Sequence, residues 1–407
     1  MNYQLSATHL SKINKEIVIS GSKSESNRLL ILQKLYPNIA IKNLSDADDA
    51  VHMQEALSTD ETSVDIGHAG TAMRFLTSFF AIQEGRETIL TGSERMQNRP
   101  IALLVDALKI LGADINYVDK IGYPPLQIRG KKLTASTVQI NGNVSSQYIS
   151  SLMMIGAKLP NGLTIELLGE ITSVPYIQMT LSLLQDLGID ANFEGTKITV
   201  LPKSTIEDAT FVVESDWSSA SYFYSIVALL EVGTTIKLSS FKNNSLQGDS
   251  CLTVIYQHFG VQTTFENESI ILEKVSETKN ETLEVDLKNA PDIAQTIAVT
   301  CFAAKIACNL TGLHTLKIKE TDRLEALKTE LTKLGANINV TDKSLHLESS
   351  TSINSNVAID TYNDHRMAMA FAPLALKVPI KINDAAVVTK SYIKFWEHMQ
   401  LLGFKLV

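Results

Sequence analysis

The chain has 407 residues, of which 44% are hydrophobic and 20% are charged, and its formal net charge at pH 7 is -8. This length and apolar content predict a globular protein of two or three domains with a packed core. The negative balance excludes a general electrostatic attraction to nucleic acid or to an anionic membrane. The N-terminal stretch MNYQLSATHLSKINKEIVI lacks the layout of a signal peptide, and no apolar run reaches the length of a membrane span. We therefore expect a cytoplasmic protein that binds any anion through a local cluster of charge.

Several predicted helices begin at a turn that carries a cation. In chain order these starts are GSKSESNRLL (21–30), GHAGTAMRFL (67–76), RMQNRPIALL (95–104), KIKETDRLEAL (317–327), NDHRMAMAF (363–371) and VTKSYIKFW (388–396). Free backbone N–H groups and the helix dipole add to the side-chain charge at such positions. A solvated surface cation explains any single one of them, but the series in an acidic chain predicts a site for small anions.

A second pattern recurs through the chain: an amphipathic run, then Leu or Phe, then Gly, then a short alternating strand. Its glycines are Gly112, Gly188, Gly260, Gly335 and Gly403. In the first copy, apolar residues at 101, 104, 105, 108 and 111 share one helical face, and Gly is the residue that stops the helix. The alternation in KITVL (197–201) and SLHLE (344–348) indicates strands with one solvated face. The pattern predicts an α/β or α+β fold of repeated helix-and-strand units, with a crossover between two halves at 201–217; the alternative is five unrelated helix ends.

Motifs for other chemistries are missing from the sequence. GSKS does not have the glycine spacing of a Walker loop, and GHAGTAM does not have that of a dinucleotide-binding turn. There is no H-E-x-x-H, no paired-cysteine cluster and no G-x-S-x-G elbow. We expect neither a metal nor a serine-hydrolase site.

A series of segments resembles one family, in the same order from end to end, the 5-enolpyruvylshikimate-3-phosphate (EPSP) synthases or 3-phosphoshikimate 1-carboxyvinyltransferases. The segments are GSKSESNR, GHAGTAMR, RPIALLVDAL, SSQY, SVPY, DWSSASYF, APDIAQT, KETDRL, YNDHRMAMAF and TKSY. The resemblance implies an inside-out, barrel-like α/β fold of two domains, each with three βαβαββ repeats. It assigns 21–214 to the N-terminal domain and 1–20 with 215–407 to the C-terminal domain. The active site is expected in the cleft between them.

The resemblance also implies an activity. Enzymes of this family transfer the enolpyruvyl group of phosphoenolpyruvate to the 5-hydroxyl of shikimate 3-phosphate by addition and elimination, and release phosphate, in the shikimate pathway of aromatic amino acid biosynthesis. The implied partners are these two small molecules, without a metal or organic cofactor, and we expect a monomer. Two polyanions bound face to face repel each other, so converging Lys and Arg side chains are required. The cationic helix starts supply them.

The family's functional positions carry over residue by residue. Asp292 matches the acid that accepts the hydroxyl proton, Glu320 the carboxyl that exchanges a proton with C3, and Lys23 the lysine that touches both substrates. The positions that match shikimate 3-phosphate ligands are Lys23, Ser24, Arg28, Ser145, Ser146, Gln147, Ser173, Asp292, Thr315 and Lys319. Those that match phosphoenolpyruvate ligands are Lys23, Gly70, Arg99, Gln147, Arg323, Arg366 and Lys390. The alternative for Asp292 is an N-cap of the helix IAQTIAV.

The chain departs from the family pattern at four positions. His68 replaces a usual Asn, Phe75 a common Pro, Val174 a common Lys, and Thr315 an Asn that often contacts shikimate. The first two flank Gly70, so the shape of the phosphoenolpyruvate pocket and the response to the compact inhibitor glyphosate stay open. Thr315 receives little weight as a ligand.

Two other functions compete with this reading. The sister family with the same fold transfers enolpyruvate to a UDP-linked aminosugar and usually carries a loop cysteine in its N-terminal half. This chain has no cysteine before Cys251. An inactive anion-binding homologue would be expected to lose Lys23, Asp292 or Glu320, and all three are present. Both alternatives are therefore disfavoured.

Overall fold

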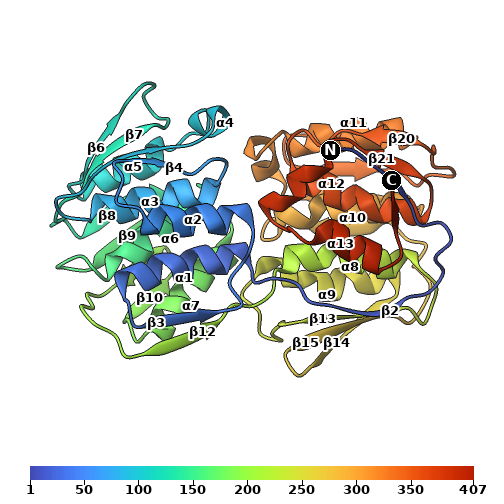
Figure 1. Cartoon of the computed structure of the whole chain (residues 1–407), viewed down its shortest axis with the longest axis horizontal. Coiled ribbons are helices and arrows are strands. Elements are labelled where there is room, and N and C mark those ends of the chain that lie inside the picture. Colours follow the sequence, from blue (N-terminus) through green and yellow to red (C-terminus); the bar gives the residue numbers. More distant parts are fainter. The chain divides into compact units, whose positions relative to one another are not determined.

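The computed structural model describes residues 1–407, apart from the side chain of Ile318, as two compact units (Figure 1). The N unit is Gly21–Val213, and the C unit combines Met1–Ser20 with Glu214–Val407. Each unit has a hydrophobic core of its own. The expected boundary at 214 is one residue too late. Glu214 belongs to the C unit, where its Oε1 accepts hydrogen bonds from Trp217 Nε1 at 2.8 Å and from Lys242 N at 2.9 Å.

The N unit contains two complete βαβαββ repeats. The first comprises β4 (Ser63–Asp65), α3 (Gly70–Ala81), β5 (Glu87–Thr91), α5 (Ala102–Ile110), β6 (Asp114–Tyr117) and β7 (Leu126–Arg129), with the short α4 (Glu94–Gln97) before α5. The second comprises β8 (Thr137–Asn141), α6 (Ser146–Gly156), β9 (Leu163–Leu168), α7 (Val174–Asp186), β10 (Ala191–Glu194) and β11 (Lys197–Val200). Each sheet joins a parallel pair to an antiparallel hairpin, in the orders β4-β5-β7-β6 and β8-β9-β11-β10.

The third repeat of the N unit is shorter than expected. Its elements are α1 (Lys23–Leu35), β3 (Ile39–Lys42), α2 (Asp48–Ser58) and β12 (Ala209–Val212). β3 and β12 form a two-stranded parallel sheet with Ile39 opposite Ala209. In the described chain α2 leads to β4 of the next sheet, so no hairpin completes this repeat. The expectation of three full repeats is therefore wrong for the N unit.

The C unit has three four-stranded sheets. The first repeat contains β2 (Asn14–Ile17), α8 (Trp217–Leu229), β13 (Thr235–Ser239), α9 (Leu252–Ile255), β14 (Val261–Glu266) and β15 (Ser269–Lys274). The second contains β16 (Leu283–Asp286), α10 (Ala294–Ala303), β17 (Cys308–Thr311), α11 (Arg323–Lys333), β18 (Ile338–Val340) and β19 (Leu345–Leu347). The third contains β20 (Val357–Ile359), α12 (His365–Phe371), β21 (Ile380–Ile382), α13 (Phe395–Leu401), β22 (Lys405–Leu406) and β1 (Tyr3–Ser6).

The first twenty residues complete two of these sheets. β1 lies between β21 and β22, with Leu5 opposite both Ile380 and Leu406, and β2 pairs in parallel with β13. Residues 1–20 therefore belong to the C unit, and the chain crosses between the units twice.

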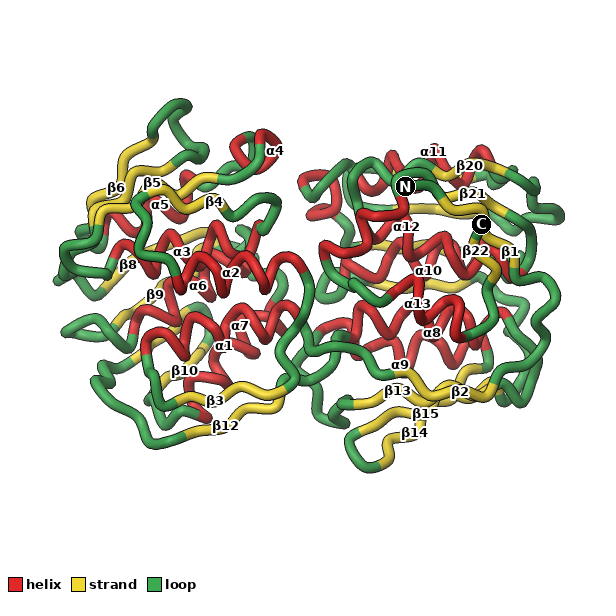
Figure 2. The backbone as a smooth tube through the Cα atoms, in the orientation of Figure 1, coloured by secondary structure: helices red, strands yellow, loops and turns green.

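Each unit places its most apolar helices inside and its strands outside (Figure 2). Every residue of α3, α8 and α10 is buried. A helix that is buried on all sides must lie in the centre of a unit, because it has no face for water. The inside-out α/β fold class is confirmed.

The repeated glycines end their helices as predicted. Gly112, Gly188, Gly335 and Gly403 all have positive φ, from 69° to 104°. The next residue bonds back to the helix in each case, as in Ala336 N to Leu331 O at 3.0 Å, which defines a Schellman motif. Before Gly260, however, the helix shortens to α9 and continues as a 3-10 turn, Tyr256–Phe259. Within the described residues, no helix has the length and apolar character needed to cross a bilayer.

Candidate active site

A cluster of acidic and basic side chains lies at the helix starts of the C unit, with Asp292 at its centre. Asp292 belongs to the 3-10 turn Pro291–Ile293 that precedes α10. Its Oδ1 accepts from Arg323 Nη1 at 2.8 Å and lies 3.5 Å from Lys319 Nζ, and its Oδ2 accepts from Arg366 Nη2 at 3.2 Å. α10 has Ile293 at its N-cap and no side-chain capping bond, so Asp292 does not cap it. Three cations therefore surround this carboxylate.

Arg323 joins three carboxylates of this cluster. It is the first residue of α11, and its side chain is only 2% exposed. Its Nε donates to Asp364 at 2.6 Å, its Nη1 to Asp292 and its Nη2 to Glu320 at 2.7 Å. Burial opposes its charge, but the neighbouring carboxylates raise the pKa of Arg323 above its ordinary value. Arg323 is therefore a fixed cation that orients the two candidate proton-transfer groups.

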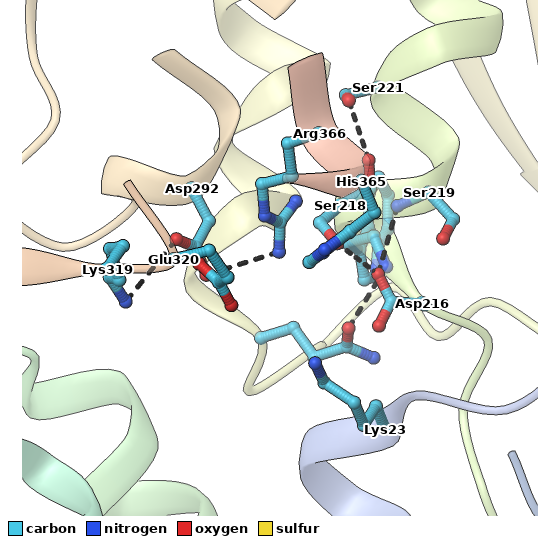
Figure 3. Close-up of polar contacts among 12 residues, drawn as sticks. Lys23, Asp216, Ser218, Ser219, Ser221, Asp292, Lys319, Glu320, His365 and Arg366 are labelled. Carbon is cyan, nitrogen blue, oxygen red and sulfur yellow. Dashed lines mark hydrogen bonds and ion pairs between the residues drawn. The ribbon is translucent and has the colours of Figure 1, made fainter. Parts of the chain in front are cut away.

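Arg366 enters the same cluster from the start of α12. Asp364 is the N-cap of this helix, and its Oδ1 accepts from Arg366 N at 2.8 Å. The Arg366 side chain is directed at Asp292 (Figure 3), while its Nε has no hydrogen-bond partner among the described residues. Lys390 lies beside the same helix start, because its Nζ donates to Asn363 O at 2.8 Å. Arg366 and Lys390 can therefore bind an anionic ligand next to Asp292.

Sequence reasoning missed Asp249, which faces this cluster from the 3-10 turn Gly248–Cys251. It is buried, and its Oδ1 has no hydrogen-bond partner among the described residues. Burial raises its pKa to about 7, with further contributions from the charges of Asp292 and Asp216. The sequence offers no motif for Asp249, because burial is the main cause of its raised pKa and no local sequence pattern shows burial. Thr315, whose Oγ1 is also buried without a described partner, lies in the 3-10 turn His314–Ile318.

In the N unit, Lys23 and Arg28 lie on the first turns of α1, but their environments differ. Lys23 Nζ is 3.3 Å from Asp49 Oδ2. Arg28 is 2% exposed, and its guanidinium donates to Thr180 Oγ1 at 2.7 Å, to Ser150 Oγ at 3.0 Å and to the carbonyl of Ser24 at 2.7 Å. Burial lowers the pKa of Arg28 to about 10. The fold already uses most of its donors, whereas Lys23 is partly accessible.

Gly70 and Arg99 form a close pair at the start of α3. Gly70 is the first residue of this helix, and a Cβ built on it would meet Arg99 Nη1. The backbone N of Arg99 donates to Met96 O at 3.0 Å, but its guanidinium makes no hydrogen bond or ion pair with the described residues, so the guanidinium is available to an anion. Arg74, in contrast, is buried and donates to Gly70 O at 3.0 Å, and burial together with the nearby charge of Arg99 lowers its pKa to about 10.

Hydroxyl and amide groups occupy two further helix starts. Ser145 caps α6 by accepting from Gln147 N, and Ser146 is the first residue of that helix. Gln147 Nε2 donates to Thr71 Oγ1 at 3.1 Å, which ties the start of α6 to the start of α3. Ser173 is the N-cap of α7 and has a left-handed backbone, with φ of 55°. These groups are typical of a phosphate site at helix N-termini.

The fold and these clusters define an α/β enzyme built to hold anions at helix starts, and comparisons with known proteins are more specific. The family model for EPSP synthase (3-phosphoshikimate 1-carboxyvinyltransferase) matches residues 54–399. A protein named 3-phosphoshikimate 1-carboxyvinyltransferase from Bacteroides fragilis is 45% identical over 99% of this chain and 98% of its own length. One of the same name from Vibrio atlanticus is 34% identical over 97% and 98%. The chain belongs to the EPSP synthase family.

Solved structures support the fold. An EPSP synthase from Acinetobacter baumannii covers 100% of this chain and 99% of its own, with a TM-score of 0.81 and 21% identity. The enolpyruvyl transferase NikO from Streptomyces tendae covers 100% and 99%, with a TM-score of 0.77 and 13% identity. At these identities the two structures establish a shared architecture only.

Proposed function

We propose that this enzyme transfers the enolpyruvyl group of phosphoenolpyruvate to the 5-hydroxyl of shikimate 3-phosphate and releases phosphate. Family membership supports the reaction. The assignment of catalytic roles to side chains rests on one observation, the cluster of Asp292, Glu320, Arg323 and Arg366. In this cluster the two candidate proton-transfer carboxylates, Asp292 and Glu320, both bond to the buried Arg323. Neither the UDP-aminosugar reaction nor an inactive homologue has an observation in its favour. We further propose a cytoplasmic monomer, as expected from the sequence.

The chemistry requires two proton transfers at different atoms. In the addition step the 5-hydroxyl oxygen bonds to C2 of phosphoenolpyruvate, Asp292 takes the hydroxyl proton, and Glu320 gives a proton to C3. In the elimination step C3 returns a proton to Glu320 as the C2–O bond to phosphate breaks, and the departing phosphate takes the proton held by Asp292, so both carboxyl groups return to their starting states. Arg323 contacts both carboxylates, so it holds them in fixed positions relative to each other. Fixed donors at the developing charge are the largest expected contribution to rate.

The N unit is proposed to supply most of the remaining anion contacts. Ser145, Ser146 and Ser173 would bind the 3-phosphate of shikimate 3-phosphate at the starts of α6 and α7. Arg99, over Gly70, would bind phosphoenolpyruvate together with Arg366 and Lys390 of the C unit. The proposed roles of Lys23, Ser24, Arg28, Gln147, Thr315 and Lys319 are those implied by the family motif.

A phosphate-release assay tests the reaction. Purified enzyme with both substrates is expected to release one phosphate per enolpyruvyl ether formed, with the product identified by mass spectrometry. Shikimate 3-phosphate is then replaced by a UDP-aminosugar, which is expected to give no release. Release only with the aminosugar, or with neither acceptor, would reject the proposal.

Asp292→Asn tests the proposed base. The amide keeps the size of the side chain but cannot take the hydroxyl proton, so we expect kcat to fall by about 10²-fold or more, with shikimate 3-phosphate binding retained by calorimetry. The matched control is Glu325→Gln, which changes an exposed carboxylate in the first turn of α11, two residues after Arg323. This variant should keep kcat. A near-wild-type kcat for Asp292→Asn would remove Asp292 from this role.

A further inference from the structure

The C unit has a pocket at the helix ends that lie away from the candidate active site. Its volume is about 580 Å³, a size typical of small-molecule sites. It is lined where α8 ends (228–230), where α10 ends (303–305) and just after the 3-10 turn Ala372–Leu376 that continues α12. The candidate active-site residues lie at the opposite ends of α10 and α12. A helix of the length of α8 spans about 20 Å, so this pocket is separate from the catalytic cluster.

Three lysines line this pocket, and they are bonded differently. Lys274 is 1% exposed, and its Nζ donates to Ala228 O at 2.8 Å, to Phe259 O at 2.5 Å and to Thr278 Oγ1 at 3.4 Å. These three bonds use all its donors. Lys377 Nζ donates to Leu229 O at 2.9 Å, and Lys305 Nζ to Thr351 O at 3.0 Å, so both keep donors for a ligand.

Two carboxylates line the same pocket, Glu231 and Glu277. Among the described residues, neither forms an ion pair with a pocket lysine within 4.0 Å. Burial lowers the pKa of Lys274 and of Lys377, while the charge of Glu277 opposes that shift in both. The ends of α8 and α10 add partial negative charge. The pocket is therefore close to charge balance and presents both signs of charge, which disfavours a simple anion as its ligand.

Lys305 occupies a strained backbone position. It follows the end of α10 with φ of 60°, and Ile306 N bonds to Cys301 O at 3.0 Å, so it holds the place that glycine holds after α5, α7, α11 and α13. A left-handed conformation at a residue with a side chain persists only where the surroundings enforce it, and such positions cluster at functional sites. Here the residue with the left-handed backbone is one of those that line the pocket.

We propose that this pocket binds a small zwitterion with an apolar body, of the amino acid class. Its carboxylate would accept hydrogen bonds from Lys305 and Lys377, and its ammonium group would face Glu231 or Glu277. Leu229, Leu230, Ile353 and Val378 supply the apolar wall for the ligand's side chain. Charge-assisted hydrogen bonds of this kind are the strong ones in a partly buried site.

Binding of L-phenylalanine and L-leucine to the full chain tests the proposal, by calorimetry and by thermal shift. At least one is expected to bind and to raise Tm with concentration. Two probes isolate the charges: 3-phenylpropionate lacks the ammonium group, and L-phenylalaninamide lacks the carboxylate. Both are expected to bind at least about tenfold more weakly than L-phenylalanine, because each loses one charge-assisted contact. Equal binding of 3-phenylpropionate would show an anion site instead and overturn the proposal, as would no binding of either amino acid.

Three variants separate binding from stability. Lys305→Gly relieves the left-handed strain, so Tm should stay equal or rise while amino acid binding weakens. Lys377→Gln keeps a donor for Leu229 O but loses the charge, and should also weaken binding. Lys381→Gln, an exposed lysine of β21 outside the pocket, is the control and should bind as the wild type does. Unchanged binding in both pocket variants would overturn the proposal. Because the readout is binding, the result does not depend on the proposed catalytic function.

Discussion

At the scale of single residues, burial decides which charges are used by the fold and which remain for a ligand. Arg28, Arg74 and Arg323 are all buried and all donate to protein groups. The Arg99 guanidinium makes no such bond to the described residues, although its sequence context is equally cationic. A composition or a motif cannot separate these arginines, because the difference is in their surroundings.

Gly70→Ala is expected to act through Arg99. The added Cβ would meet the guanidinium, which is the flexible end of a long side chain and can move, so the free energy of unfolding should change by less than about 1 kcal/mol. The displaced charge should raise KM for phosphoenolpyruvate by about tenfold. Steady-state kinetics and a thermal melt measure the two effects.

Arg99→Gln provides the control for this prediction. If the glycine acts through the arginine, the effects of the two changes on KM will not add in the double variant. Additive effects would contradict a shared mechanism.

Asp249 should make stability depend on pH. Its pKa is about 7 in the fold and close to its ordinary value in the unfolded chain, so the folded state binds more protons between about pH 4 and 7. This group's contribution to stability is present at low pH and is lost as pH rises through 7. Arg366 and Lys319 oppose the shift, and Asp292 and Asp216 add to it.

Asp249→Asn, which imitates the protonated carboxyl, should remove this dependence. We expect the Tm of the variant relative to the wild type to increase from pH 5 to pH 8 by calorimetry. Glu325→Gln serves as the exposed control. A constant difference in Tm across this range would contradict the raised pKa.

At the scale of elements, the same helix ending recurs, and in each case the residue after the helix must adopt a left-handed backbone. A Schellman motif needs a left-handed residue after the helix, and glycine adopts that backbone without a steric penalty. Gly335 has φ of 99° and only the Asn354 side chain near the site of a Cβ, at 3.4 Å. The conformation, and not the available space, therefore requires glycine there.

Gly335→Ala is expected to destabilise the protein by about 1–2 kcal/mol, the cost of a left-handed backbone for a residue with a Cβ. The free energy of unfolding from denaturant titration measures it. Thr329→Ala, an exposed position inside α11, introduces the same residue into a regular helix and should be neutral or slightly stabilising. An equal loss in both variants would show that the effect is not conformational.

At the scale of the whole molecule, the chain folds as two units with separate cores, one continuous and one discontinuous in sequence. The N unit is closed by β12, which returns from the far end of the unit to pair with β3. This pairing joins residues about as distant in sequence as the unit allows, and its parallel register depends on both ends being present. The C unit depends likewise on β1 and β2.

A fragment of residues 21–213 should therefore fold alone with a cooperative thermal transition, measured by circular dichroism. A fragment of 21–205, which lacks β12, should melt at a lower temperature because β3 loses its partner strand. Faster hydrogen exchange at the β3 amides would locate the difference. Equal transitions for the two fragments would contradict the role of β12.

The sequence was sufficient to predict many residues of the candidate site, but not the hydrogen bonds and ion pairs between them. The segments APDIAQT, KETDRL and NDHRMAM indicated Asp292, Glu320, Arg323 and Arg366 individually. That Arg323 is buried and bonded to three carboxylates follows from the packing of α11 against its neighbours, which no local pattern encodes. The sequence did not predict Asp249 or the pocket lined by Lys274, Lys305 and Lys377, for the same reason.

The sequence by itself determined the family, the α/β class, the glycine-ended helices and the helix starts that carry cations, because these follow from local conformation and motif. Only the tertiary structure decided that the N unit has one incomplete repeat, that Glu214 belongs to the C unit and which cations are already bonded within the fold. Those properties depend on desolvation and on contacts between distant segments, which are set when the chain packs.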